Sequence, residues 1–183
     1  KNLDEKSIML IADGKVRRVE FALKNIKEIL KKRQDFKIWI AGNYGDYDKE
    51  LKEMVKSEGI EKNVIFFGRV SDSKLRELYA KAHIFVHLQR IQPFGLVFIE
   101  AMSCGTPVIA IKKGGLEETV IENKTGVFFE KQDPNAILEA MNRFNKIDFD
   151  YEFIRNQSLK YSTTNFELKI KKFIKSIGKN DKS

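Results

Sequence analysis

Six short runs of consecutive apolar residues recur along the chain, each too short to form a helix and rich in β-branched side chains. Uninterrupted apolar runs of this length are typical of strands that are buried on both faces of a sheet. We therefore expect six strands, at residues 8–12, 38–41, 64–67, 84–88, 108–111 and 127–129.

Between these runs, apolar residues return at spacings of three and four, which is the period of a helix with one buried face. One such stripe comprises Val19, Ala22, Leu23, Ile26, Ile29 and Leu30, and another comprises Leu75, Leu78, Tyr79 and Ala82. Strands that alternate with helices predict parallel pairing through right-handed crossovers. The pattern therefore predicts an α/β fold: a doubly wound, Rossmann-like parallel sheet of about six strands.

Capping residues mark the starts of two of these helices. Ser71 precedes one amphipathic segment, and Asp133 followed by Pro134 precedes another. Each is a residue type that favours the first turn of a helix. Beyond residue 147 the pattern predicts no further strand, but two closing helices and a frayed polar end over residues 178–183. We expect one domain throughout residues 1–183.

The net charge narrows the choice of partner. The chain carries 34 Lys and Arg against 26 Asp and Glu, a formal charge of +8. Such an excess of positive charge favours an anionic binding partner, which could be a nucleotide, a nucleic acid or an acidic membrane surface. We do not expect a nucleic acid, because charge is the only feature that supports it. Near the C-terminus, lysines alternate with apolar residues, as on a solvated helix or one that contacts anionic lipid. These lysines are Lys169, Lys171, Lys172, Lys175, Lys179 and Lys182.

Other protein classes are excluded by what the sequence lacks. No apolar run approaches the roughly 20 residues of a membrane-spanning helix, and no secretory start is present, so we expect a cytoplasmic protein, peripheral at the inner membrane face if it contacts lipid. Cys104 is the one cysteine, and with only His83 and His87 it forms no metal-ligand cluster. We expect Cys104 to be a small buried side chain and His87 to be a core residue.

The loop at residues 88–100 is the most informative candidate site, because ligands of open parallel sheets bind at the carboxyl ends of the strands. Gly95 would let the backbone approach a ligand, and the amides of Phe94, Gly95 and Leu96 would face a phosphate at the positive end of the helix dipole. Glu100 would lie one turn further on the same face, within reach of a ribose diol. Since its neighbours look packed, we expect Glu100 to be shielded from solvent.

The segment QPFGLVFIEAMSCGTPVIA at residues 92–110 resembles the signature of the group 1 retaining glycosyltransferases, which have the two-domain GT-B architecture. In that family, two glutamates separated by seven residues bracket the motif. The first contacts the donor sugar and the second contacts the ribose of the nucleotide. The resemblance implies the second role for Glu100, whereas Gln92 stands at the first position. An amide can donate and accept hydrogen bonds but carries no charge.

Two further segments share this resemblance, which extends from about residue 38 to residue 144. VIFFGRV at residues 64–70 resembles the strand and loop on which the nucleobase rests, and it implies base contacts from Gly68, Arg69 and Val70. GGLEE at residues 114–118 resembles the glycine turn that faces the donor. The loop at residues 42–45, which begins with Gly42, would lie beside the base and phosphates.

The cations that usually neutralise the diphosphate are altered here. The family has Gly-Arg after the first strand and Lys-Gly a few residues later. In this chain Ile11 and Ala12 occupy the first pair, and Arg17 and Arg18 occupy the second. Arg17 can replace the lysine because a guanidinium binds phosphate in a bidentate manner. Our hypothesis is that Lys15 compensates for the missing arginine.

The resemblance implies that residues 1–183 form the donor-binding half of a longer enzyme, whose acceptor domain precedes them and without which they are inactive. The whole enzyme would transfer a hexose from a UDP- or GDP-linked sugar with retention, using no metal or cofactor, by electrostatic stabilisation of the diphosphate. Two alternatives stay open: a GT-B nucleotide-sugar epimerase and a non-catalytic nucleotide-sugar-binding domain. Gln92 and Ala12 favour the latter. No GxGxxG or GxxxxGK[ST] motif is present to indicate a dinucleotide or phosphate-loop domain.

Overall fold

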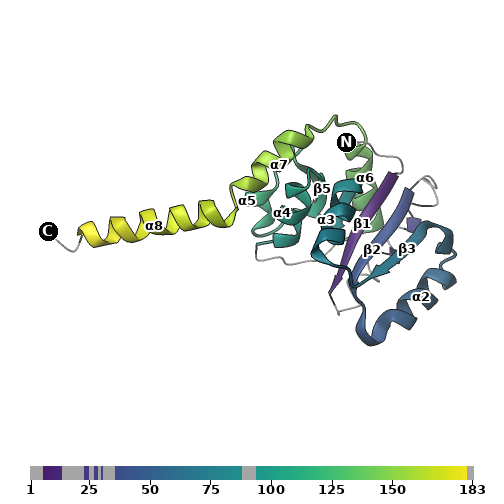
Figure 1. Cartoon of the computed structure of the whole chain (residues 1–183). Helices are drawn as coiled ribbons and strands as arrows, with labels where there is room; N and C mark the ends of the chain where they lie inside the picture. The colour runs from purple at the N-terminus through teal and green to yellow at the C-terminus, as the bar shows by residue number, and fades with distance from the viewer. Residues whose placement is uncertain are drawn as a thin grey trace.

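The chain folds around one parallel sheet of six strands in the order β3-β2-β1-β4-β5-β6 (Figure 1). The computed structural model describes residues 6–13, 23–24, 27–28, 30, 36–87 and 94–180. The strands are β1 (Lys6–Asp13), β2 (Phe36–Asn43), β3 (Val64–Gly68), β4 (Ile84–His87), β5 (Val108–Ile111) and β6 (Gly126–Phe129). All six predicted strands are confirmed, and the strand order is that of a doubly wound Rossmann-like fold.

Helices follow the strands, and those up to α5 connect one strand to the next. In the described chain they are α2 (Asp48–Ser57), α3 (Asp72–Lys81), α4 (Leu96–Ser103), α5 (Leu116–Thr119) and α6 (Pro134–Phe144), with 3-10 turns η1 (Gly45–Tyr47) and η2 (Glu61–Asn63). Both predicted caps are confirmed. Ser71 Oγ accepts a hydrogen bond from the Lys74 amide at 3.3 Å, and Asp133 Oδ1 accepts one from the Ala136 amide at 3.0 Å.

From β4 to β6 the sheet is buried on both sides, which explains the uninterrupted apolar runs of these strands, whereas no residue of the edge strand β3 is fully buried. Every residue of β5 and β6 is buried, as are the first three residues of β4. The helical stripe predicted over residues 19–30 lies only partly within the described residues. Its members Leu23 and Leu30 are buried against the core, as predicted.

Two helices end the described chain, as predicted: α7 (Tyr151–Leu159) and α8 (Thr163–Asn180). Helix α7 packs against α4, whereas α8 extends away from the rest of the chain (Figure 1). Because α8 continues to Asn180, the prediction of a frayed end is wrong for residues 178–180, and residues 181–183 lie outside the described part. Within the described residues, no helix is long and apolar enough to span a membrane.

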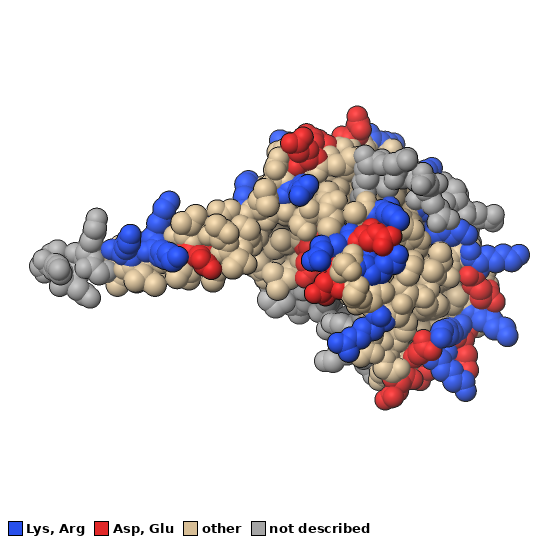
Figure 2. Space-filling view, in the orientation of Figure 1, with Lys and Arg blue, Asp and Glu red and all other residues tan. Residues whose placement is uncertain are grey.

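The apolar side of α8 has nothing packed on it in the described chain. Its large side chains, all between 42% and 64% exposed, are Phe166, Ile170, Phe173, Ile174 and Ile177. Figure 2 shows basic side chains clustered along the outer part of α8, next to uncharged surface. The helix therefore presents both an apolar and a basic surface to its surroundings.

Candidate functional site

The strand order locates the candidate site. Strand β1 pairs with β2 on one side and β4 on the other, so the chain reverses its direction of travel across the sheet at β1 and β4. In open parallel sheets, the carboxyl ends of the strands at this switch point form the crevice in which ligands bind. The loops that leave β2, β3, β4 and β5 begin at this edge.

Gly95 begins α4 with a left-handed backbone, φ 76° and ψ 49°. A Cβ atom at this position would come within 2.5 Å of Leu116 Cδ2 and 3.0 Å of Phe98 Cδ2. The left-handed dihedral angles therefore favour glycine here, and a larger residue would also force the Leu116 side chain to shift. This approach brings the start of α4 next to the glycine turn at residues 114–118.

The side chains of Phe94 and Leu96, at the start of α4, are exposed, whereas Gly95 and Phe98 are buried. Within the described chain, the first hydrogen bond of the helix is donated by the Phe98 amide to the Gly95 carbonyl at 3.0 Å. The amides of Leu96 and Val97 come before this bond and so have no acceptor within the helix. The Phe94 side chain is 42% exposed and that of Leu96 is 64% exposed. The amides and the helix dipole together can bind an anion here.

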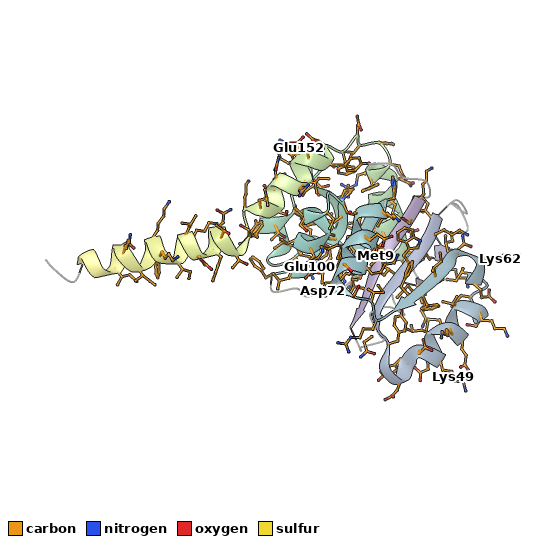
Figure 3. All side chains as sticks on the ribbon, in the orientation of Figure 1. Met9, Lys49, Lys62, Asp72, Glu100 and Glu152 are labelled. Atoms are coloured by element: carbon orange, nitrogen blue, oxygen red, sulfur yellow. The ribbon has the colours of Figure 1, made fainter. Side chains whose placement is uncertain are left out.

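Glu100 lies on α4, one turn beyond Leu96. It is exposed, so the expectation that it is shielded from solvent is wrong. The apolar neighbours Phe98, Ala101 and Met102 pack on the inner face of α4, and Glu100 occupies the other face. Figure 3 shows Glu100 beside Asp72 of α3.

The Glu100 carboxylate lies against α3, where the Tyr79 hydroxyl donates a hydrogen bond to Glu100 Oε2 at 3.4 Å. Partial loss of solvation raises the pKa of Glu100, the hydrogen bond from Tyr79 lowers it, and the charge of Asp72 raises it. Although the residue as a whole is exposed, its carboxyl group is thus harder to ionise than that of an ordinary glutamate. Among the described residues, Oε1 has no hydrogen-bond partner, which leaves it accessible to a ligand hydroxyl.

Tyr44 joins the loops that follow β2 and β3. Its buried hydroxyl donates to the Ile40 carbonyl at 2.7 Å and accepts from the Gly68 amide at 2.8 Å. Burial raises the pKa of Tyr44, so this hydroxyl keeps its proton. The bond holds the loop after Gly42 next to the segment at residues 68–70. Sequence reasoning missed Tyr44, because a tyrosine between Asn43 and Gly45 does not reveal a partner 24 residues away.

The residues expected to contact the base lie together at this edge. Gly42, with φ 134°, is the next-to-last residue of β2, and Gly68, with φ 66°, is the last residue of β3. The Arg69 side chain is exposed, and Val70 is partly buried against the core. Ala12 is in register with Gly42, so the end of β1 reaches the same edge. Their roles stay predictions.

The remaining predicted site residues lie outside the described part of the chain. These are Gln92, Arg17 and Lys15, together with Arg18.

Cys104 is described, and its expected burial is wrong: as the C-cap of α4 it is only partly buried. His87, expected to be a core residue, is likewise only partly buried, although its ring packs against Phe98 with the ring centroids 5.6 Å apart. No group of His, Cys, Asp or Glu in the described residues could hold a metal ion.

Tyr161, between α7 and α8, is a second contact that sequence reasoning missed. Its ring lies edge-on to Phe94, with centroids 5.7 Å apart and an interplanar angle of 77°. Its hydroxyl donates to the Glu118 carbonyl at 2.6 Å. Tyr161 therefore links the C-terminal helices to both glycine-containing turns of the site.

The fold is a Rossmann-like α/β sheet that matches solved structures of the GT-B class. The family model described as glycosyl transferases group 1 matches residues 2–165, and the chain belongs to this family. A curated relative, an uncharacterized glycosyltransferase of Methanocaldococcus jannaschii, is 31% identical over 141 residues, which cover 76% of this chain and 36% of that protein.

A second relative is the GDP-mannose-dependent alpha-(1-6)-phosphatidylinositol monomannoside mannosyltransferase of Mycolicibacterium smegmatis, 29% identical over 129 residues. These cover 67% of this chain and 34% of that protein. Mannosylfructose-phosphate synthase of Agrobacterium fabrum is 41% identical over 87 residues, which cover 46% of this chain and 19% of that protein. The chain thus spans about a third of its relatives' length or less.

Solved structures share the fold. Sucrose-phosphate synthase from Thermosynechococcus elongatus matches with a TM-score of 0.76 and 25% identity, over 97% of this chain and 46% of that one. HepE of Anabaena, solved in complex with UDP and glucose, matches with a TM-score of 0.78 and 20% identity, over 94% of this chain and 49% of that one. At the identity of the second match, the likeness shows the fold alone.

Proposed function

We propose that this chain binds the nucleoside-diphosphate sugar donor of a glycosyltransferase at the edge formed by the loops after β2, β3, β4 and β5. The observation that supports this most strongly is the entry of α4. Gly95 opens the helix in contact with Leu116, and the Glu100 carboxylate stands one turn beyond. An anion-binding helix terminus next to a carboxylate matches a diphosphate joined to a ribose diol.

Each predicted residue has a role in this proposal. The amides of Phe94, Gly95 and Leu96 bind the diphosphate, and Glu100 accepts hydrogen bonds from the ribose hydroxyls. The base lies against main-chain groups at Gly68 and Val70, the stem of Arg69, and the loop after Gly42. Gln92 contacts the donor sugar, and the cations that offset the leaving charge are Arg17 and Lys15.

The reaction we propose is transfer of a hexose with retention of anomeric configuration. The bond between the anomeric carbon and the diphosphate oxygen breaks, a bond to an acceptor oxygen forms, and the acceptor proton leaves with the diphosphate. The protein acts by stabilising the charge that develops on the diphosphate, through amides and cations already in position. In this proposal, the transfer requires no metal and no cofactor; the nucleotide sugar is a substrate.

The donor domain, residues 1–183, needs a second half to complete a cleft in this proposal. The chain spans 36%, 19% and 34% of the length of three curated relatives, which leaves room for an acceptor domain in proteins of that size. Residues 1–183 alone bind the donor without transferring sugar. GDP-mannose is named for the mycobacterial relative and UDP is bound in the HepE structure, so both nucleotides are candidates.

A non-catalytic nucleotide-sugar-binding role is the second candidate. It is favoured by the amide at Gln92 and by Ala12, which replace charged residues of the family pattern. A glycosyl-transfer assay on the full-length protein with UDP-, GDP- and ADP-linked sugars separates the two. Transfer supports the enzyme, donor binding without transfer supports the binding role, and interconversion of donor epimers identifies the epimerase.

Replacing Glu100 by alanine tests the ribose contact. A hydrogen bond to a charged group contributes about 1.5–3 kcal/mol, so Glu100→Ala should weaken nucleotide binding roughly tenfold to a hundredfold. Thermal shift with UDP, GDP and ADP selects the nucleotide, and titration calorimetry then measures the dissociation constant.

The matched control is Glu152→Ala, which removes an exposed carboxylate of α7 at a distance from Glu100 (Figure 3). It should leave the dissociation constant unchanged. If Glu100→Ala binds as tightly as the control, the ribose assignment is wrong.

A further inference from the structure

Tyr79 is the one described side chain that bonds to the Glu100 carboxylate, and it is held firmly in place. The residue is 2% exposed. Its ring lies edge-on to Phe85, with centroids 5.5 Å apart and an interplanar angle of 79°. Its carbonyl accepts a hydrogen bond from Thr106 Oγ1, at the turn that follows α4. The tyrosine is thus fixed from both α3 and the core.

The Tyr79 hydroxyl has Glu100 Oε2 as its hydrogen-bond partner in the described chain, at 3.4 Å. Burial, followed by the negative charge of Glu100, raises the pKa of Tyr79. The hydroxyl therefore keeps its proton and remains a donor. A buried phenol needs such a partner, because an unpaired polar group in the interior is costly.

The two members of this pair differ in mobility. Tyr79 is packed on all sides, whereas Glu100 is an exposed side chain with several rotatable bonds. An unrestrained glutamate loses conformational entropy when it is ordered around a ligand. A hydrogen bond from the rigid Tyr79 hydroxyl already orders the Glu100 side chain in the free protein. Less conformational entropy is then lost when the ligand binds.

We propose that Tyr79 is a positioning residue, whose hydroxyl holds Glu100 Oε2 so that Oε1 faces the ribose hydroxyls of the donor. This inference rests on the proposed function. The 3.4 Å separation is longer than the usual O–H···O distance of about 2.7–2.8 Å, and bonds of this kind tighten when the ligand binds. Tyr79 itself does not touch the nucleotide.

The experiment compares ribonucleotides with nucleotides that lack the ribose hydroxyls. Titration calorimetry measures UDP against 2′,3′-dideoxy-UDP, and GDP against 2′,3′-dideoxy-GDP, on the full-length protein and on Tyr79→Phe. The substitution keeps the ring that packs on Phe85 and removes only the hydroxyl. We expect it to weaken the ribonucleotide by about threefold to tenfold, as for loss of one hydrogen bond, and to leave the dideoxy nucleotide unchanged.

Two further variants complete the design. Tyr151→Phe removes another half-buried phenol, on α7, and should change neither affinity. Tyr79→Phe combined with Glu100→Ala should bind the ribonucleotide no more weakly than Glu100→Ala alone, because the tyrosine acts through the glutamate.

The outcomes separate the inference from the proposed function. If the unsubstituted protein binds neither UDP nor GDP, or binds ribo and dideoxy forms equally, the proposed function fails. If the protein prefers the ribonucleotide through Glu100, but Tyr79→Phe weakens both forms alike or neither of them, Tyr79 is a packing residue only. An effect confined to the ribonucleotide supports the positioning role.

Discussion

The ionisation of Glu100 sets an expected pH dependence for donor binding. Its pKa is raised by partial loss of solvation, above the value of about 4.3 for a free glutamate side chain. Only the ionised carboxylate accepts hydrogen bonds at both oxygens. Nucleotide affinity should therefore be complete above the raised pKa and fall as the pH drops through it.

Titration calorimetry of the nucleotide over the acidic range measures this dependence. Tyr79→Phe removes the hydrogen bond that lowers the pKa of Glu100, so its affinity should begin to fall at a higher pH. In the control variant Glu100→Gln, residue 100 does not ionise. The pH dependence of nucleotide binding by this variant therefore reflects the titration of the phosphate, which has a second pKa of about 6. If Glu100→Gln and the unsubstituted protein follow the same pH curve, Glu100 does not bind the nucleotide as a carboxylate.

The sequence predicts where individual site residues lie on α4, but it does not predict which residues they contact. The motif located Gly95 and Glu100 correctly on the first turns of α4, because their spacing follows helical geometry. The partners of these residues are distant in sequence, as Tyr79 is from Glu100 and Tyr161 is from Phe94. Such pairs depend on how α3, α4 and α7 pack, which local periodicity does not encode.

Strands and helices were predictable wherever burial is uniform. The runs that became β5 and β6 are buried throughout, so continuous hydrophobicity was sufficient evidence. Helix α2 was not predicted, because Leu51 and Val55 are its only buried residues and make too short a stripe. Helix α5 has only four residues, fewer than periodicity can identify. The exposure of Glu100 was misjudged, since small neighbours on one face of α4 do not bury the other.

At the scale of the whole molecule, α8 extends away from the rest of the described chain and leaves its apolar side uncovered. Its apolar side chains, including Phe166 and Phe173, are exposed, although such contiguous apolar surface is typical of an interface. The chain spans about a third of its relatives' length or less, so further chain is available to cover it in a protein of that size. The proposed function therefore predicts that the acceptor domain covers this face in the full-length protein.

Hydrogen exchange tests this proposal. Amides at residues 166–177 should exchange more slowly in the full-length protein than in residues 1–183 alone, because packing suppresses local opening. Phe173→Asp should abolish the difference, whereas Lys171→Glu, on the basic side, should preserve it. Protection that arises only when phosphatidylserine vesicles are added would show instead that α8 contacts an anionic membrane.

The central claim is that the first turn of α4 binds a diphosphate while Glu100 binds the attached ribose, and a crystal structure with bound nucleotide tests it most directly. Crystals soaked with UDP, and with GDP in parallel, should show phosphate oxygens facing the amides at Gly95 and Leu96. The ribose hydroxyls should lie within hydrogen-bonding distance of Glu100. A nucleotide bound at another edge of the sheet, or a Glu100 side chain that makes no contact with the sugar, would contradict the account.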